Sequence, residues 1–376
     1  MTIEQSGAVR MKSTNGILPA QDLRDLIDQG TITLDAPLGD KQLQPASLDL
    51  RLGTAAFRVR ASFLPGPGTN VQDRIDALAL HKIDLIGGAV LETGCVYIVP
   101  LLESLQLPSH IAAATNPKSS TGRLDVFTRV IADGVNAFDQ IPDGYNGPLY
   151  AEICPQTFPV IVRTGSTLSQ IRFRVGQPTE NDEQLRELHA RDVLIAGGSE
   201  TDIQNGIALS VDLSQELAEA SGGLVGYRAK RNTGLVDVDA PKSCSISEYW
   251  EPIHRGTSSG LILDPDQFYI LASKEAVHVP PTHAAEMVPF NPLVGEFRVH
   301  YAGFMDPGFG HAAAGGAGAR VVLEVRSHKV PFVLEDGQIV GRLIYERMTE
   351  IPEWLYGDDL GSHYQAQGLK LSKHFV

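Results

Sequence analysis

Two stretches of the sequence, one in each half, decide how the chain is organised. The first is Leu91-Glu-Thr-Gly-Cys-Val-Tyr97-Ile-Val, followed by Glu103 and Leu105-Gln-Leu-Pro108. The second is Leu263-Asp-Pro-Asp-Gln-Phe-Tyr269-Ile-Leu, followed by Glu275 and Val277-His-Val-Pro280. Tyr, Glu and Pro recur at a constant spacing of 172 residues. Self-similarity at a fixed spacing indicates a repeated structural unit.

The same spacing recurs further along the chain. Ala151-Glu152-Ile153, with Pro159 and Gly165, corresponds to Leu323-Glu324-Val325 with Pro331 and Gly337. Earlier, Ser47-Leu-Asp49-Leu resembles Ser210-Val-Asp212-Leu, at spacings that drift between 163 and 170 residues as loop insertions would cause. This ordered series predicts two diverged copies: a first unit over residues 1–178, a connection over 179–200, a second unit over 201–355 and a C-terminal segment over 356–376.

Each copy is predicted to consist mainly of short strands. Short apolar or alternating runs bounded by Gly, Pro, Asp or Asn are typical of strands, and they include Val96–Val99, Pro159–Val162, Leu168–Phe173, Val321–Val325 and Ile339–Tyr345. Helical patterns are few: Pro19–Gln29 ends at Gly30, and the polar stretch Thr179–Asp192 has Thr179 as its candidate N-cap. The predicted fold class is all-β with a few short helices, arranged as two tandem barrels or jelly rolls.

Composition and charge exclude several classes of protein. Of 376 residues, 43% are hydrophobic and 20% are charged, so the chain can bury cores and is not disordered. The formal net charge of −14 disfavours a general nucleic-acid binder. The three cysteines form no C-x-x-C pair, and no apolar run approaches the roughly eighteen residues of a membrane span. We therefore expect a soluble cytoplasmic protein with neither a membrane nor a nucleic-acid polymer as its partner.

The stretch Thr115-Asn-Pro-Lys118-Ser119-Ser120-Thr-Gly-Arg123 is the most informative for chemistry. It gathers two cations, several hydroxyls and a glycine, which together can form an anion-binding cradle. A polar turn at the end of a strand would look the same when considered alone.

A second group of polar residues follows in Ile141-Pro-Asp143-Gly144-Tyr145-Asn-Gly147-Pro-Leu-Tyr150-Ala-Glu152. The turn residues predict a hairpin that leads into a strand carrying Glu152. A glutamate on an otherwise apolar strand is costly to bury without a role, so its side chain should face a substrate or a partner. A salt bridge to a neighbouring arginine is the alternative.

These motifs occur in an order that resembles the dCTP deaminase family of the dUTPase-like superfamily. The matching stretches are Ser47-Leu-Asp49-Leu-Arg-Leu-Gly53, the cradle, the hairpin with Glu152, Gln170-Ile-Arg-Phe173, and the tail from Tyr356 to Lys373. The usual family member has one such unit, so this chain resembles a longer, duplicated form. The resemblance implies two tandem dUTPase-like distorted jelly rolls, and conversion of dCTP to dUTP and ammonia in pyrimidine deoxynucleotide metabolism.

The resemblance also implies roles for individual residues. Glu152 would be the general base that activates water, with Ser119 and Arg123 holding that water and the developing charge. Substrate binding would involve Lys118, Ser120, Asp143, Tyr145, Gln170 and, from a C-terminal lid, Tyr364, Gln367 and Lys373. Magnesium would arrive on the triphosphate, and no zinc would be needed.

The second copy departs from the family pattern in a way that leaves two arrangements open. It keeps Met305-Asp306-Pro-Gly-Phe309 and Glu324, but at the cradle positions it has no cation and no serine. Sites in this superfamily lie between units of a threefold ring, which implies a homotrimer. First copies of different chains could meet and use Glu152, which we prefer on symmetry grounds. Alternatively, the cradle could face the second copy in a composite site that uses Asp306 and Glu324.

Three other functions compete with a deaminase of this family. A zinc-dependent cytidine deaminase is disfavoured because Cys154-Pro155 has no second cysteine of a P-C-x-x-C motif. dUTP pyrophosphatase activity, alone or added to deamination, is the main alternative because the superfamily shares the cradle. A nucleotide-binding protein without turnover is the third.

Overall fold

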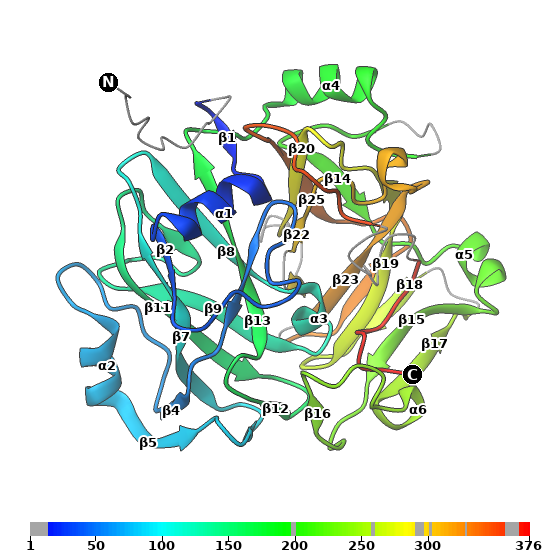
Figure 1. Ribbon diagram of the computed structural model, residues 1–376. Helices are drawn as coiled ribbons and strands as arrows, with labels where there is room; N and C mark the ends of the chain where they lie inside the picture. Colours follow the sequence, from blue (N-terminus) through cyan, green and yellow to red (C-terminus); the bar gives the residue numbers. More distant parts are fainter. Residues whose placement is uncertain are drawn as a thin grey trace, which may run out of the picture.

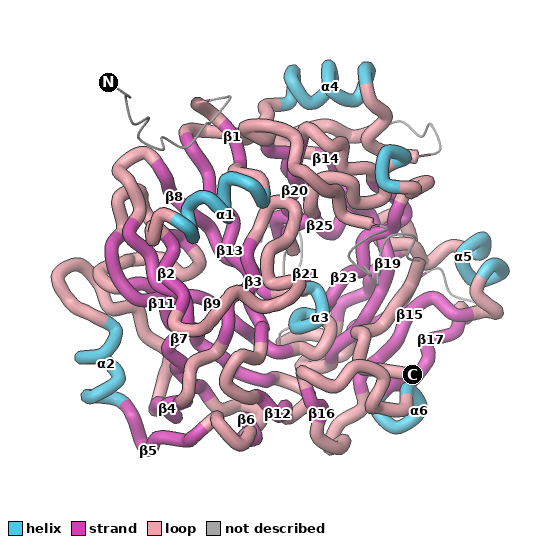
Figure 2. Tube along the Cα trace, viewed as in Figure 1, coloured by secondary structure: helices cyan, strands magenta, loops and turns pink. Residues whose placement is uncertain are grey.

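The computed structural model describes residues 14–196, 201–256, 260–289, 297–300, 303–327, 329–357 and 368–376. Strands are the main regular secondary structure in both halves of the described chain, and the helices are short and peripheral (Figure 2). The two halves form two domains that lie side by side, the N-terminal one drawn in blue to green and the C-terminal one in green to red (Figure 1).

The first domain contains thirteen described strands and three helices. The strands are β1 (Gly16–Ile17), β2 (Ile32–Leu34), β3 (Leu48–Arg51), β4 (Ala55–Val59), β5 (Ala79–Asp84), β6 (Ala89–Leu91), β7 (Val96–Gln106), β8 (Ile111–Pro117), β9 (Val126–Ala132), β10 (Gln140–Ile141), β11 (Asn146–Pro155), β12 (Val160–Val162) and β13 (Thr167–Val175). The helices are α1 (Ala20–Asp28), α2 (Val71–Leu78) and α3 (Ser119–Gly122).

After α4 (Asp182–Arg191), the second domain repeats this plan. Its described strands are β14 (Ile207–Ser210), β15 (Leu224–Ala229), β16 (Val236–Asp237), β17 (Trp250–His254), β18 (Gly260–Leu263), β19 (Phe268–Val277), β20 (His283–Pro289), β21 (Phe297–His300), β22 (Phe304–Met305), β23 (Ala319–Ser327), β24 (Phe332–Glu335) and β25 (Ile339–Arg347). Its helices are α5 (Gln215–Ala220), α6 (Ile246–Tyr249) and the 3-10 helix η2 (Ala312–Ala314).

The strand pairing shows that the two domains are copies of one unit. In the first domain, one sheet has the order β1-β13-β8-β10 with β3 on β13, the next has the order β5-β4-β7-β11-β9, and β6 pairs with β12. The second domain has the corresponding sheets β14-β25-β20-β22, β17-β15-β19-β23-β21 and β18-β24. The prediction of two tandem β-rich units is confirmed.

The local sequence explains the main strands and helices. In β11 the residues from Leu149 to Ile153 are buried on both faces of the strand, as expected for a strand between two layers. Helix α1 ends where predicted, before Gly30 with its positive φ of 73°. Helix α4 differs slightly, because its N-cap is Asn181 in a capping box with Gln184 and not Thr179.

An aromatic cluster joins the two domains. Trp250 of the second domain is 1% exposed, and its ring lies 5.4 Å from Phe158 of the first domain and 5.5 Å from Phe375 near the C-terminus. Burying aromatic rings between the domains stabilises one fixed arrangement of the pair. None of the described helices is long and apolar enough to cross a membrane.

Candidate active site

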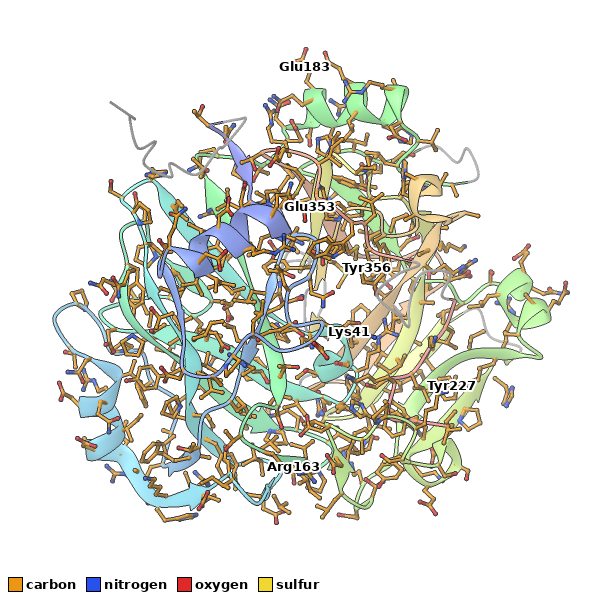
Figure 3. The ribbon with its side chains drawn as sticks, viewed as in Figure 1. Lys41, Arg163, Glu183, Tyr227, Glu353 and Tyr356 are labelled. Carbon is orange, nitrogen blue, oxygen red and sulfur yellow. The ribbon has the colours of Figure 1, made fainter. Side chains whose placement is uncertain are left out.

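A cavity of about 480 Å³ lies between the two domains, a volume suited to a small-molecule ligand. Figure 3 labels Lys41 and Tyr356, two of its lining residues, where the domains meet. Polar lining residues come from both domains, and they include Asp49, Lys118, Ser119, Ser120, Arg123, Thr167, Gln170, Asp306, Glu324 and Lys373.

The first domain contributes the predicted anion cradle. Lys118 stands between β8 and α3, where its Nζ donates to the Asp49 carboxylate on β3 and to Thr167 Oγ1 at 2.9 Å. Burial raises the pKa of the Asp49 carboxyl, and the nearby Lys118 and Lys373 oppose that rise. On the first-domain side of the cavity, Lys118 and Lys373 therefore lie near one buried carboxyl group, that of Asp49.

The C-terminal segment, residues 368–376, packs against this cradle. Arg123 Nη1 donates to the carbonyl of Lys370 at 3.0 Å, and Ser372 Oγ donates to the carbonyl of Ser120 at 2.9 Å. Phe375 is 8% exposed and packs with the aromatic cluster. The tail from Tyr356 to Val376 is polar and contains glycines, which predicts too little apolar surface for it to pack without a ligand. This prediction is wrong for residues 368–376, which bury Leu371 and Phe375.

The second domain contributes Glu324, which lies next to Arg123 in the lining of the cavity. Its Oε1 lies 3.8 Å from Arg123 Nε, and the side chain is 4% exposed. Burial raises the pKa of Glu324 to about 8, against the opposing effect of Arg123. A carboxyl with a pKa near the working pH can both accept and donate a proton.

The second domain also contributes Asp306, from the hairpin that follows β22. Arg172 of the first domain reaches across to it, with Nη2 at 3.1 Å from Oδ1, and both side chains are buried. Burial raises the pKa of Asp306, and Arg172 opposes the rise. Gly310 ends this hairpin with a φ of 64°, and a Cβ there would lie 2.2 Å from the carbonyl of Val277. A glycine is required at that turn.

Glu152 occupies a different place from Glu324, although it is the equivalent residue of the first copy. Two nitrogens of Arg129 bind its Oε1, at 2.5 and 3.1 Å, on the neighbouring strand β9. It does not line the cavity that contains the cradle. Within one chain, then, Glu152 is engaged in the salt bridge that the sequence left as an alternative.

Two further predicted residues also lie away from the cradle. Asp143 is exposed and lines a second cavity, of about 820 Å³, in the first domain. Tyr145 is buried, and its hydroxyl donates to the carbonyl of Pro148 at 2.6 Å and accepts from the backbone N–H of Asp133. Its contacts are structural, because they fix the hairpin to its own strand.

Some predicted positions cannot be placed. Tyr364 and Gln367 lie outside the described residues, as do the residues of the second copy at the positions equivalent to Lys118, Ser119 and Ser120. Lys373 is described, and it lines the cavity. Burial and the nearby Lys118 lower its pKa.

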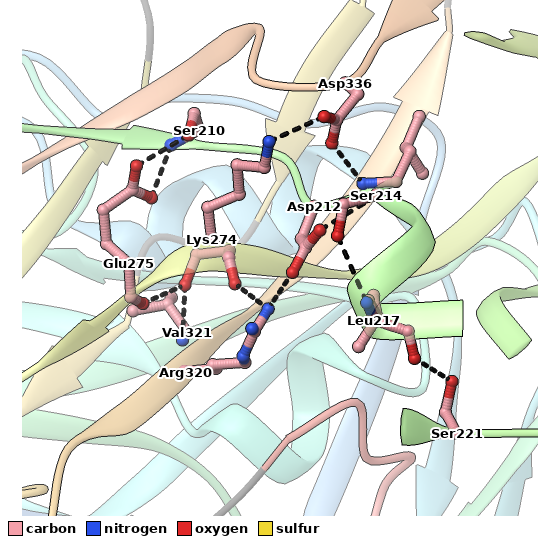
Figure 4. Close-up of polar contacts among 12 residues, drawn as sticks. Ser210, Asp212, Ser214, Leu217, Ser221, Lys274, Glu275, Arg320, Val321 and Asp336 are labelled. Atoms are coloured by element: carbon pink, nitrogen blue, oxygen red, sulfur yellow. Dashed lines mark hydrogen bonds and ion pairs between the residues drawn. The ribbon is translucent and has the colours of Figure 1, made fainter. Parts of the chain in front are cut away.

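The second copy uses its equivalent of Asp49 differently. Asp212 binds Arg320 of its own domain and accepts from the backbone N–H of Ser214 at 3.0 Å (Figure 4). Lys274 pairs nearby with Asp336 at 2.6 Å. Asp212 thus forms its contacts within its own domain, whereas Asp49 lines the cavity between the domains.

Sequence reasoning assigned no role to Asp49 or Arg172. A signal was present, because each is a charged residue inside an apolar strand: Leu48-Asp49-Leu50 and Ile171-Arg172-Phe173. The partner of Arg172 lies 134 residues away and belongs to the other domain, so only the assembled structure shows it.

Most of the chain matches one family in sequence and structure. Residues 14–177 match the 2'-deoxycytidine 5'-triphosphate deaminase N-terminal domain, and residues 181–375 match the C-terminal domain of the same enzyme. The chain belongs to the dCTP deaminase family. The crystal structure of 2'-deoxycytidine 5'-triphosphate deaminase from Agrobacterium tumefaciens superposes with a TM-score of 0.85 at 58% identity, covering 91% of this chain and all of that one.

Shorter relatives match less than half of the chain. A dCTP deaminase from Shewanella amazonensis is 29% identical over 176 residues, which are 44% of this chain and 87% of that protein. A "dCTP deaminase, dUMP-forming" from Methanosphaera stadtmanae is 27% identical over 162 residues, which are 42% of this chain and 78% of that protein. The predicted family, its fold class and the enzyme class of dCTP deaminase are confirmed.

Proposed function

We propose that this dCTP deaminase hydrolyses dCTP to dUTP and ammonia at one composite site per chain, built from the cradle of the first domain and the hairpin and glutamate of the second. The observation that carries the proposal is that Arg123 of the first domain and Glu324 of the second lie 3.8 Å apart in the lining of the 480 Å³ cavity. Each domain supplies the half that the other lacks. Lys118 and Arg123 have no counterpart pair at the equivalent second-copy positions, and the hairpin position of Asp306 is Pro142 in the first copy.

Each residue has a role that its position supports. Ionised Glu324 removes a proton from a water molecule as the water oxygen bonds to C4 of cytosine. The C4=N3 double bond becomes single as the water oxygen adds. The protonated carboxyl then gives its proton to the amino group, which leaves as ammonia when the bond between C4 and the amino nitrogen breaks, and the remaining hydroxyl proton moves to N3 to give the uracil ring. Arg123 and Ser119 stabilise charge on the reacting atoms. Lys118, Ser120 and Lys373 bind the triphosphate, with magnesium entering as part of the substrate.

Asp306 is proposed to orient the nucleoside. Arg172 holds its carboxylate and also binds the carbonyls of Ala285 at 3.1 Å and Met305 at 3.3 Å, so the hairpin is fixed before substrate arrives. A fixed acceptor in a buried site orients a substrate without a cost for reorganisation. Gln170 also lines this cavity.

Several expectations stay predictions. These are a site that uses Glu152 between chains, substrate contacts from Tyr364 and Gln367, independence from zinc, a homotrimer, and a cytoplasmic location. The residues proposed for the composite site all belong to one chain, so the proposal does not depend on a trimer.

The experiment is to incubate the pure protein with dCTP and magnesium, in the presence of a zinc-selective chelator, and to follow ammonia, dUTP and dUMP. Ammonia in equal amount to dUTP is the expected result. Because relatives named as dUMP-forming are similar to this chain, accumulation of dUMP would instead establish added pyrophosphatase activity. Nucleotide binding without ammonia release would contradict the proposal.

A further inference from the structure

Two equivalent small sheets, one in each domain, differ at their outer edge. In the first domain β6 pairs with β12, with Val90 opposite Ile161. In the second domain β18 pairs with β24, with Ile262 opposite Val333. These are the same positions at the spacing of 172 residues, so the two sheets can be compared residue by residue.

The edge of the first-domain sheet is covered by a third strand. Strand β16 of the second domain pairs in parallel with β12 (Figure 1), with N–H groups of Val236 and Val238 donating to the carbonyls of Pro159 and Ile161 at 3.0 and 3.2 Å. Arg163 at the end of β12 then binds both carboxylate oxygens of Asp237 at 2.7 Å. The strand and its salt bridge close this edge.

The edge of the second-domain sheet has no such cover within the part of the chain that the structure describes. The only strand that pairs with β24 there is β18. Val333 is the equivalent of Ile161, whose carbonyl accepts a hydrogen bond from Val238, the residue after β16, and so points away from β6. Because β18 and β24 pair in the equivalent register, the N–H and C=O of Val333 point away from β18. Its side chain is 54% exposed, and Ile262 beside it and Val330 are 59% and 47% exposed. An edge strand with unpaired backbone groups and an apolar face is a template for another strand.

The charge at this edge is reversed relative to the first domain. Glu335 is the equivalent of Arg163, the residue that follows β12, so a strand that covers β24 must bring a cation and not an aspartate. The chain has such a cation beside β24 itself: Lys329, which is exposed, two residues before Pro331. The edge therefore has Lys329 before Val333 and Glu335 after it. Two antiparallel copies of this edge would bring each charge close to the opposite charge of the other copy.

We propose that β24 pairs antiparallel with β24 of a second copy of this chain, about a twofold axis at Val333. In this register Val333 faces Val333 of the second copy, and Pro331 faces Glu335. Lys329 is then diagonal to Glu335 of the second copy, about 7–8 Å away and within reach of a long side chain. The two small sheets become one sheet of four strands, and Ile262 and Val333 of both copies form a continuous apolar row.

This contact makes the number of chains in the assembly even. It is isologous, as twofold contacts are. The homotrimer expected from the family resemblance would then be one half of an assembly of six chains, and not the complete assembly. Strands β18 and β24 do not line the active-site cavity, so loss of the contact should leave deamination unchanged.

The test is the mass of the wild-type protein by light scattering and sedimentation, compared with that of Val333→Lys. We expect an even number of chains in the wild type. In the variant we expect half that mass, with a dissociation constant raised at least about tenfold because two like charges meet at the axis. Ile86→Lys, at an apolar residue that is 71% exposed in the first domain, is the matched control and should not change the mass.

Charge reversal tests the register. Glu335→Lys should weaken the contact, and adding Lys329→Glu to the same chain should restore it to within about threefold. Activity per chain within about twofold of wild type shows that each variant is folded. A wild-type protein with one or three chains, an unchanged mass in Val333→Lys, or a double variant that fails to recover would each overturn the proposal.

Discussion

Arg123 of the first domain and Glu324 of the second face each other with Nε 3.8 Å from Oε1, and neither side chain is more than 4% exposed. A buried acid and a buried cation at this separation are not a tight ion pair. Burial therefore raises the pKa of the Glu324 carboxyl more than the positive charge of Arg123 lowers it. Both residues line the same cavity. The proposed general base, Glu324 of the second domain, therefore lies next to Arg123 of the anion-binding cradle in the first domain.

The first prediction concerns the pH dependence of catalysis. Because Glu324 must be ionised to accept a proton and burial raises its pKa to about 8, kcat/KM for dCTP should rise with pH and level off above about 8. A pH profile measured from 6 to 9.5 checks this. A profile that is flat across that range would show that the base ionises with an ordinary glutamate pKa.

The second prediction concerns stability and follows from the same raised pKa. The folded state favours protonated Glu324 and the unfolded state titrates near the ordinary value of 4.5, so ionisation of Glu324 destabilises the fold progressively from about pH 4.5 to 8. Glu324→Gln should therefore match the wild type near pH 4 and be more stable than it at pH 9. Melting temperatures at both pH values test this, and equal stability at pH 9 would be inconsistent with a buried, ionisable Glu324.

The fold was largely predictable because its signals are local or repeated. Short apolar runs such as Val321–Val325 predicted strands, and the recurrence of Tyr97 as Tyr269 and of Glu152 as Glu324 predicted two copies. Helix α1 was also predictable, since its apolar face and the following Gly30 are adjacent in the sequence.

The composition of the site was less predictable because it depends on how the domains pack. The sequence pointed to Lys118 and Arg123, and to Asp306 and Glu324 as an alternative composite site, but symmetry favoured Glu152 as the glutamate that faces the cradle. That choice depends on the register of β9 and β11, which brings Arg129 opposite Glu152. Sequence spacing alone carries no information about such a pairing between strands, and none about contacts between domains.

The third prediction compares two arginine–aspartate pairs that cross between the domains. Arg172 is 2% exposed and pairs with buried Asp306, whereas Arg163 is 39% exposed where it pairs with Asp237. Arg172→Met should lower the free energy of unfolding by about 3–5 kcal/mol, because it leaves a buried carboxylate without its cation. Arg163→Met, the control, should cost about 1 kcal/mol or less. Urea unfolding measures both, and equal effects would contradict the role given to Arg172.

The fourth prediction concerns the C-terminal segment. Phe375→Ala should cost about 3–5 kcal/mol of stability because the ring is buried against Phe158 and Trp250. It should also raise KM for dCTP, since the same segment contacts the cradle through Ser372. Val376→Ala is the matched control, because Val376 is 66% exposed. If Phe375→Ala were as stable and as active as Val376→Ala, the segment would not be part of the site.

The most direct test of the composite site is kcat for dCTP in two single variants, Glu324→Gln and Glu152→Gln. The two glutamates are equivalent positions of the two copies, and the amide keeps the shape of each side chain, so each variant is the control of the other. We predict that Glu324→Gln lowers kcat by roughly 10²–10⁴ while nucleotide binding changes only a few-fold, and that Glu152→Gln stays within about threefold of wild type. Full activity in Glu324→Gln, with loss of turnover in Glu152→Gln, would contradict the composite site.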